Sequence, residues 1–221
     1  KLAGCVSHEV VKLGAGILSG RSPLTNPAEQ LEQYQNYAQM EGVIGDRVEL
    51  TFVPMRNALF LTLAANRAIC LGVSDLVTGV CEADNANYPD CRGAFIRSQA
   101  ATITEALGED FFIHTPLLHL SKAESIAMAW DQGSYAALAL THTAYDGQYP
   151  PVGKDHATLL RAEGFVQADM PDPLVVRAWM EGLMPLPSGS NYAYVKVMDC
   201  QRAVFQLLQQ LATFKSLEVG A

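Results

Sequence analysis

The residues with the clearest chemical potential lie in two polar segments of the chain. The first, Phe52–Asn57, places a proline two residues before an arginine. The second, Gly79–Arg92, contains carboxylates, a tyrosine, a cysteine and another arginine. Arginine binds carboxylates and phosphates through its planar fork, and carboxylates accept hydrogen bonds from N–H groups. The two segments together predict a site for an anionic or polar small molecule.

The elements that position these segments follow an alternating order. Arg56–Leu71 is rich in Leu and Ala and lacks Gly and Pro, which predicts a mostly buried helix that ends at Gly72. A buried strand over Asp75–Val80 is predicted next, followed by a helix over Cys91–Leu107 with Asp90 as its N-cap. A strand over Phe111–Leu118 then leads to a helix that begins at the capping box Ser121–Glu124 and runs to about Trp130. This order predicts an α/β fold with a parallel, doubly wound sheet.

The flanking regions carry weaker patterns. Val6–Leu13 alternates slightly, which predicts a short strand, and the Gly- and Pro-containing region after it predicts a surface insertion with one short helix near Ala28–Met40. After a loop over Thr141–Lys154, the chain is predicted to form a helical turn at His156–Ala162 and helices at Leu174–Glu181 and Val197–Leu217. We therefore expect a sheet domain over residues 1–161 and a helical C-terminal extension over 162–221.

Composition restricts the partners. The net charge is -8 and no Lys/Arg cluster is present, which argues against nucleic acid as a direct partner. The five cysteines include no C-x-x-C pair, and neither a signal peptide nor a spanning segment is found, so we expect a cytoplasmic protein with reduced thiols that does not bind membranes. The apolar tail Ala203–Leu208 would pack within the chain or at a homodimer interface, and the sequence does not choose between them.

Three carboxylates follow the predicted Asp75–Val80 strand, where an open parallel sheet binds its ligands. Glu82, Asp84 and Asp90 would orient amino or amide N–H groups of a ligand, or hold a magnesium ion beside phosphates. Tyr88 would stack on a ring. The alternative is a polar loop in which Asp90 serves only as a helix cap.

Two cations fall in the first turns of predicted helices, where the helix dipole disfavours them. Arg56 would pair with a carboxylate or phosphate, and Lys122 would stabilise phosphate charge; for each, the alternative is a solvated surface side chain. Cys91 has no identifiable base nearby in sequence, so packing is its expected role. The five histidines show no metal-binding spacing, and we expect structural roles for them.

These segments resemble the 7-cyano-7-deazaguanine synthase family. The family's motif close to F-V-P-G-R-N is matched by Phe52–Asn57, and its motif close to T-G-V-x-x-x-D-x-x-x-Y-P-D-C-R is matched by Thr78–Arg92. Thr115-Pro116-Leu117 and the segment Ser121–Glu124 are also similar to the family, and the resemblance runs from about Cys5 to Arg161.

The resemblance implies a three-layer αβα fold of the adenine nucleotide hydrolase type. It implies a ligase that converts 7-carboxy-7-deazaguanine to the nitrile with ATP, magnesium and ammonia, in queuosine and deazaguanine biosynthesis. On this resemblance Lys122 and Asp84 are the catalytic residues, and the substrate-binding residues are Arg56, Asn57, Glu82, Tyr88, Asp90, Cys91 and Arg92.

The chain departs from the family in three places. No segment matches the family's phosphate loop, close to S-G-G-x-D-S, and the chain starts at Lys1, so we expect that loop to be absent or unrecorded. Met55 replaces a glycine, and the tail is longer than the family implies. The family's structural zinc is held by four cysteines, but Val152, Asp155 and Thr158 stand at three of these positions and His142 lies near the first.

These departures leave further interpretations open. Asp155 with His142 and His156 would bind a metal only weakly, so we expect no metal site and a loop held by Pro150, Pro151 and packing. Two alternatives to the synthase remain: a related ATP-dependent enzyme acting on another carboxylate, as in defence-associated relatives, and a non-catalytic binding or assembly subunit that lacks the ATP loop.

Overall fold

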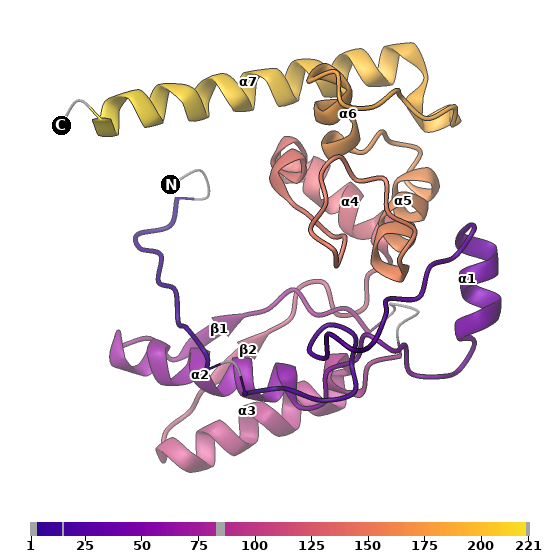
Figure 1. The fold of residues 1–221 in the computed structure, drawn as a ribbon. Coiled ribbons are helices and arrows are strands. Elements are labelled where there is room, and N and C mark those ends of the chain that lie inside the picture. Colours follow the sequence, from indigo (N-terminus) through magenta and orange to yellow (C-terminus); the bar gives the residue numbers. More distant parts are fainter. Residues whose placement is uncertain (1–3, 15, 83–86, 220–221) are drawn as a thin grey trace.

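The computed structural model describes residues 4–14, 16–82 and 87–219, and its helices and strands form two groups (Figure 1). The sheet group consists of α2 (Arg56–Cys70), β1 (Asp75–Val77), α3 (Gly93–Leu107) and β2 (Phe112–His114). The helical group consists of α4 (Lys122–Asp131), α5 (His156–Gln167), α6 (Pro173–Met180) and α7 (Tyr194–Val219). The helix α1 (Tyr37–Ile44) lies beside α5, and short 3-10 turns occur at Pro89–Cys91, Tyr135–Leu140 and Ser190–Tyr192.

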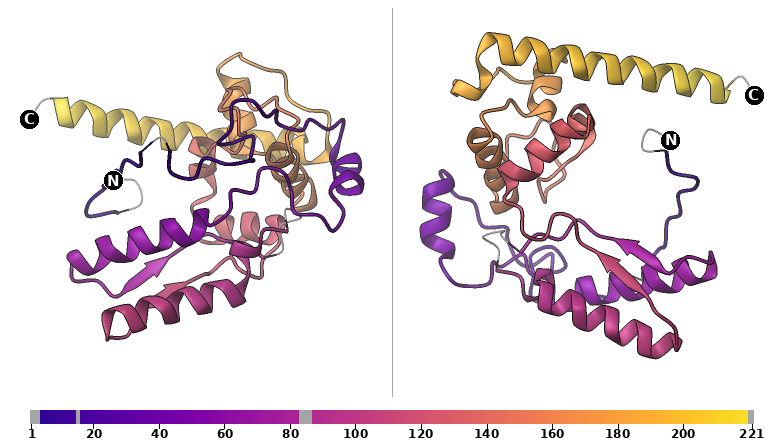
Figure 2. Two further views of the ribbon diagram at one scale, coloured as in Figure 1. Left: turned by 60° about the horizontal axis from the view of Figure 1, so that its bottom comes forward. Right: turned by 180° about the vertical axis from the view of Figure 1, so that it is seen from behind.

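The sheet has two parallel strands in the described part of the chain, with Asp75 opposite Phe112 and Val77 opposite His114. Helices α2 and α3 cover one face of the sheet, as the view from behind in Figure 2 also shows. The helix and strand residues that face inward form a small core of Ala65, Ala68, Ile69, Leu76, Ile103, Phe111 and Ile113. The predicted α/β order and the parallel pairing are therefore confirmed.

The opposite face of the sheet is open in the described chain. Val77 is 72% exposed and Phe112 is 53% exposed on that face. The prediction of a buried strand is therefore wrong for β1, and both strands are shorter than predicted because hydrogen-bonded pairing between them spans only three residues of each. A three-layer sandwich is not clearly visible in this arrangement.

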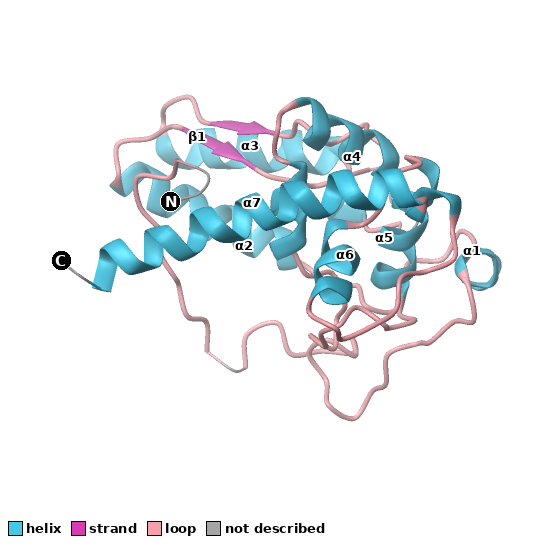
Figure 3. Ribbon diagram, turned by 90° about the horizontal axis from the view of Figure 1, so that it is seen from above, coloured by secondary structure: helices cyan, strands magenta, loops and turns pink. Residues whose placement is uncertain are grey.

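The helical group has a larger core of its own. Ile126, Tyr135, Ala139, Phe165, Val176, Cys200 and Val204 pack together and connect α4, the 3-10 turn, α5, α6 and α7. The predicted helices at Leu174–Glu181 and Val197–Leu217 are confirmed, and α7 extends beyond the rest of the group (Figure 3). None of the helices in the described residues combines the length and the apolar character needed to cross a bilayer.

Two predictions near the N-terminus are wrong. Val6–Leu13 forms no strand and is largely exposed, because no second strand lies beside it to accept its hydrogen bonds. The helix expected near Ala28–Met40 begins only at Tyr37, because the Asn36 side chain accepts a hydrogen bond from the Gln39 N–H and caps the helix there.

Candidate functional site

Asp90 joins the two polar segments at the N-terminus of α2. Its Oδ2 accepts a hydrogen bond from the Asn57 backbone N–H at 3.1 Å, and the Asn57 side-chain amide donates to the Asp90 carbonyl at 3.0 Å and to Cys91 Sγ at 3.4 Å. A carboxylate is favoured there because α2 presents unpaired N–H groups and the positive end of its dipole. Asp90 is 6% exposed, and its Oδ1 accepts no hydrogen bond from the described residues.

Glu82, and not Asp90, caps α3. Glu82 Oε2 accepts a hydrogen bond from the N–H of Gly93, the first residue of α3, at 3.2 Å, and the formal N-cap Arg92 contributes no side-chain hydrogen bond. The prediction that Asp90 is the N-cap of the helix after it is therefore wrong. Asp90 thus caps α2, which precedes it, while Glu82 caps α3, and the two contacts hold the N-terminal ends of α2 and α3 close to each other.

Tyr88 is held by the segment that precedes α2. Its hydroxyl lies 3.1 Å from Glu49 Oε2 and 2.5 Å from Thr51 Oγ1, while its ring packs on Phe52 with 5.4 Å between centroids. The Arg56 guanidinium lies 6.0 Å from the same ring. Burial raises the pKa of Tyr88 well above its ordinary value, so the phenol stays protonated.

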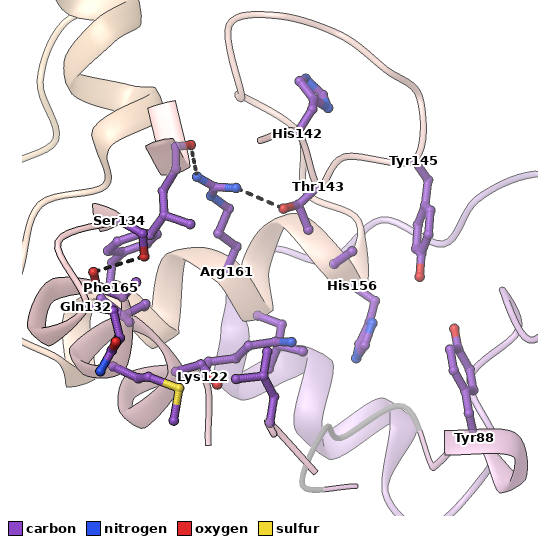
Figure 4. A pocket seen from close by; sticks show the side chains of 18 residues that line it. Tyr88, Lys122, Gln132, Ser134, His142, Thr143, Tyr145, His156, Arg161 and Phe165 are labelled. Atoms are coloured by element: carbon purple, nitrogen blue, oxygen red, sulfur yellow. Dashed lines mark hydrogen bonds between the residues drawn. The ribbon is translucent and has the colours of Figure 1, made fainter. Parts of the chain in front are cut away.

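A pocket of about 670 Å³ lies next to Tyr88, between the sheet group and the helical group (Figure 4). Its size is that of a small-molecule site. Lys122, the first residue of α4, points into it from below, and His156 and Tyr145 lie on the side toward Tyr88. The remaining lining residues include Leu117, Ser125, Ile126, Met128, Gln132, Ser134, Leu138, His142, Thr143, Leu160, Arg161 and Phe165.

The ionisable side chains of the pocket are basic or phenolic. Lys122, His142, His156 and Arg161 line it, and no carboxylate does among the described lining residues. Such a pocket in a chain of net charge -8 favours an anionic ligand. The capping box of α4, in which the Ser121 hydroxyl accepts from the Glu124 N–H and Glu124 accepts from the Ser121 N–H, is confirmed and fixes the turn that carries Lys122.

Arg161 anchors the far wall of the pocket. It binds Asp172 through two hydrogen bonds of 2.6 and 2.8 Å, donates to the hydroxyls of Thr141 and Thr143, and stacks 5.5 Å from the Phe165 ring. With six hydrogen bonds in all, its guanidinium joins the middle of α5 to the loop before it and to the start of α6.

The structure brings most of the predicted site residues together. Asn57 binds Asp90 and Cys91, and Arg56 lies over the ring of Tyr88. Of the predicted residues, Tyr88 and Lys122 line the pocket. Glu82 binds the N–H at the start of α3, and Arg92 is exposed, with no side-chain hydrogen bond or ion pair to the described residues. Asp84 lies outside the described residues. Whether these side chains bind substrate stays a prediction.

Four residues of this region were not predicted from sequence: Glu49, Tyr145, His156 and Arg161. Only Glu49 carried a usable signal, since it is the single charged residue of the mostly apolar stretch Val48–Val53 and a lone charge in such a stretch needs a buried partner. His156 was expected to be structural; it is 3% exposed and lines the pocket.

The loop at which the family resemblance implies a zinc site has side chains that do not fit zinc. Asp155 is 2% exposed and its Oδ1 accepts hydrogen bonds from the N–H groups of Ala157 and Thr158, which makes it the N-cap of α5. The Thr158 hydroxyl donates to Asp155 Oδ2 at 2.6 Å, and Val152 has no donor atom. No group of three or more His, Cys, Asp and Glu side chains suited to a metal is found in the described chain.

A parallel sheet whose strand ends lead into carboxylate-capped helices, beside a pocket whose ionisable side chains are basic or phenolic, is typical of the class of α/β proteins that bind small anionic molecules. Comparison with known proteins identifies the family within that class. The chain belongs to the queuosine biosynthesis protein QueC family, whose model matches residues 2–169.

Named relatives agree with this membership. A 7-cyano-7-deazaguanine synthase of Gloeobacter violaceus is 45% identical over 177 residues, which are 77% of this chain and 73% of that protein. Proteins of the same name from Chromobacterium violaceum and Laribacter hongkongensis are 43% and 44% identical over 65% and 58% of this chain. The chain spans 62% and 56% of the lengths of these two relatives.

Proposed function

We propose that this protein is a 7-cyano-7-deazaguanine synthase that converts 7-carboxy-7-deazaguanine to the nitrile with ATP and ammonia. The observation that carries the proposal is the junction at Asn57, Tyr88 and Asp90, where both polar segments meet beside the cationic pocket. The names of the relatives from three bacteria support the same reaction.

The residues of the site have separate tasks in this proposal. Asp90 Oδ1, buried and without a hydrogen bond from the described residues, accepts an N–H of the heterocycle. Lys122 stabilises negative charge as the substrate carboxylate reacts with ATP, because its ammonium group lies at the pocket. Arg56 and Arg92 attract the anionic reactants from the sheet side. Asp84, with magnesium on the ATP phosphates, keeps the catalytic role that the family resemblance implies.

The fold proposed for the complete protein is the three-layer αβα type. Parallel sheets occur almost only with both faces covered, and the exposed Val77 and Phe112 lie on a face that the described elements leave open. We propose that a further layer covers this face. Double substitution of Val77 and Phe112 by serine should lower the free energy of unfolding by several kcal/mol if the face is covered, at about 1.5–3 kcal/mol per side chain. A change near zero would count against a third layer.

The loop over residues 141–155 is proposed to fold without zinc. The Asp155–Thr158 pair caps α5 and Arg161 binds the other end of the loop, so protein groups satisfy the contacts there. Dialysis against a strong chelator should leave Tm unchanged, and metal analysis should find no stoichiometric zinc. A clear drop in Tm on chelation would overturn this part of the proposal.

The direct test incubates full-length protein with 7-carboxy-7-deazaguanine, ATP–Mg and ammonia. We expect AMP and the nitrile, detected by chromatography and mass spectrometry. Absence of both would refute the synthase. ATP turnover that ignores the deazaguanine acid would instead favour a different carboxylate, and failure to bind ATP in calorimetry would favour a non-catalytic subunit.

A matched pair of lysine variants tests the role of the pocket. Lys122→Met should lower kcat by about 100-fold, since a donor aimed at developing charge has an effect of that order. Lys12→Met, at an exposed lysine that does not line the pocket, should leave kcat unchanged. Equal activity of the two variants would remove Lys122 from the mechanism.

A further inference from the structure

Glu49 is a buried carboxylate for which the reaction provides no direct task. It is 2% exposed and lies in an irregular segment before α2. A carboxylate in such a place costs several kcal/mol of desolvation unless hydrogen bonds satisfy it. Its burial therefore requires that the donors around it are fixed in place.

Those donors converge on one oxygen. Glu49 Oε2 accepts from the Thr51 backbone N–H at 2.6 Å, from the Thr51 hydroxyl, and lies 3.1 Å from the Tyr88 hydroxyl. The Tyr88 hydroxyl also lies 2.5 Å from Thr51 Oγ1. The Tyr88 hydroxyl has one proton and three possible acceptors: Thr51, Glu49 and the Tyr145 hydroxyl. The charged carboxylate of Glu49, to which Tyr88 donates at 3.1 Å, is the strongest of these acceptors.

Donation to Glu49 turns the Tyr88 proton toward the chain interior. The side of the Tyr88 oxygen that faces the pocket then presents lone pairs, and the hydroxyl of Tyr145 lies on that side (Figure 4). The ring itself has little freedom, because Phe52 and Arg56 pack on it. Burial keeps the pKa of the phenol raised, so the proton remains on the oxygen.

We propose that Glu49 is a positioning residue that fixes the Tyr88 hydroxyl as a hydrogen-bond acceptor toward the pocket. The ligand group that such an acceptor selects is an N–H donor, as on the ring or amino nitrogen of a nitrogen heterocycle. A ligand of this kind would replace the Tyr145 hydroxyl at Tyr88. The substrate class rests on the proposed function, whereas the orientation of Tyr88 rests on the hydrogen bonds alone.

The kinetic test uses a double-mutant cycle on the full-length protein. Tyr88→Phe and Glu49→Leu should each raise KM for the acid by about threefold to tenfold with kcat little changed, since one neutral hydrogen bond has about that effect. In the Tyr88→Phe background, Glu49→Leu should add no further increase. Glu49→Gln should restore the wild-type KM, because its amide oxygen accepts the same hydrogen bonds.

The cycle separates positioning from general stability. If Glu49 only stabilises the fold, Glu49→Leu lowers Tm, leaves KM of the folded fraction unchanged, and the proposal is overturned. Additive increases in KM would overturn it as well. If Glu49→Leu does not fold, Glu49→Met takes its place, since its side chain has a similar length and its thioether is only a weak acceptor for the Tyr88 hydroxyl.

A spectroscopic test needs no turnover and so stands apart from the proposed function. In protein labelled with 3-fluorotyrosine, the ¹⁹F signal that Tyr88→Phe removes is that of Tyr88. This signal should shift in Glu49→Leu and stay in place in Asp46→Leu, where an exposed acid of the same segment is lost. An unmoved signal in Glu49→Leu refutes the positioning role, whereas an inactive wild-type protein with a shifted signal refutes only the synthase assignment.

Discussion

The two walls of the candidate site are stabilised by different forces. The sheet-side wall, residues 49–57 with 87–93, is held by hydrogen bonds between distant segments: Asn57 to Asp90, Tyr88 to Glu49, and Asn87 to the carbonyls of Gly45 and Arg47. The helical wall, α4 and α5 with residues 141–155, rests on a continuous apolar core and on Arg161.

This difference separates the tasks of polar side chains on the two walls. On the sheet-side wall, a single polar group contributes both to the scaffold and to the candidate site, so a substitution there changes both at once. On the helical wall, the apolar core supplies the stability, and Asp155 and Thr158 cap α5 without lining the pocket. The comparison predicts that the two walls respond differently to mutation.

The largest effect is expected at Arg161. Its side chain is 13% exposed and that of Asp172 is 4%, so Arg161→Ala leaves a buried carboxylate without its partner. The free energy of unfolding should fall by about 3–5 kcal/mol in urea denaturation. Arg202→Ala removes an ion pair whose side chains are 69% and 56% exposed, and it should change the free energy of unfolding by less than about 1 kcal/mol. Similar losses in the two variants would show that the helical wall does not depend on Arg161.

The next effect concerns the contact between α4 and α5. A Cβ atom at Gly164 would lie 2.6 Å from Lys122 Cβ, closer than side chains approach. Gly164→Ala should therefore cost about 1–3 kcal/mol of stability and displace Lys122, which lowers kcat as well. The matched variant is Gly42→Ala in α1, where nothing lies within 4 Å of the new Cβ and the helix should gain up to about 1 kcal/mol. A stable and fully active Gly164→Ala would contradict the close approach.

A pair of capping carboxylates tests the difference between the walls directly. Asp90→Ala and Asp155→Ala each remove the acceptor at a helix N-terminus and should each cost about 1 kcal/mol of stability. Only Asp90→Ala should also raise KM, because Asp90 belongs to the sheet-side wall. Asp155→Ser, which retains a capping oxygen, should recover most of the loss. An equal rise in KM in both alanine variants would mean that the walls do not divide their tasks as we infer.

Local patterns were sufficient to predict the helices that carry the site. The Leu- and Ala-rich run over Arg56–Leu71 and the capping box at Ser121 depend on neighbouring residues only, and both helices formed where they were predicted. The prediction that the first of them is mostly buried is wrong, since only Ala58, Leu61, Ala65 and Ala68 are buried. That Glu82 caps α3 and Asp90 caps α2 depends on which helix ends meet in space, and no local sequence pattern contains that information. The strands were predicted too long for the same reason, since strand length depends on the partner strand.

The pocket residues show the same limit. Tyr88 and Lys122 were found because they lie in motifs, whereas Tyr145 and His156 lie in or beside a loop that carries no pattern of its own. These two residues reach the pocket because α5 packs on α4, and no local sequence pattern predicts that packing. The division of the chain at residue 161 stays a prediction, although the core of the helical group draws on residues from both sides of it.

The smallest expected effect is a gain in the free energy of unfolding, from a substitution of Met55 at the start of α2. Met55 has φ 63 and ψ 8, a left-handed conformation that an L side chain adopts at a cost, and it is 68% exposed. Met55→Gly removes that cost but gives the unfolded chain more freedom, so the free energy of unfolding should rise by only about 0.5 kcal/mol. Met55→Ala keeps the strained φ and should change nothing in urea denaturation. If both variants behave alike, the methionine contributes through its side chain, and the sheet-side wall then depends on apolar contact to a greater extent than its hydrogen bonds indicate.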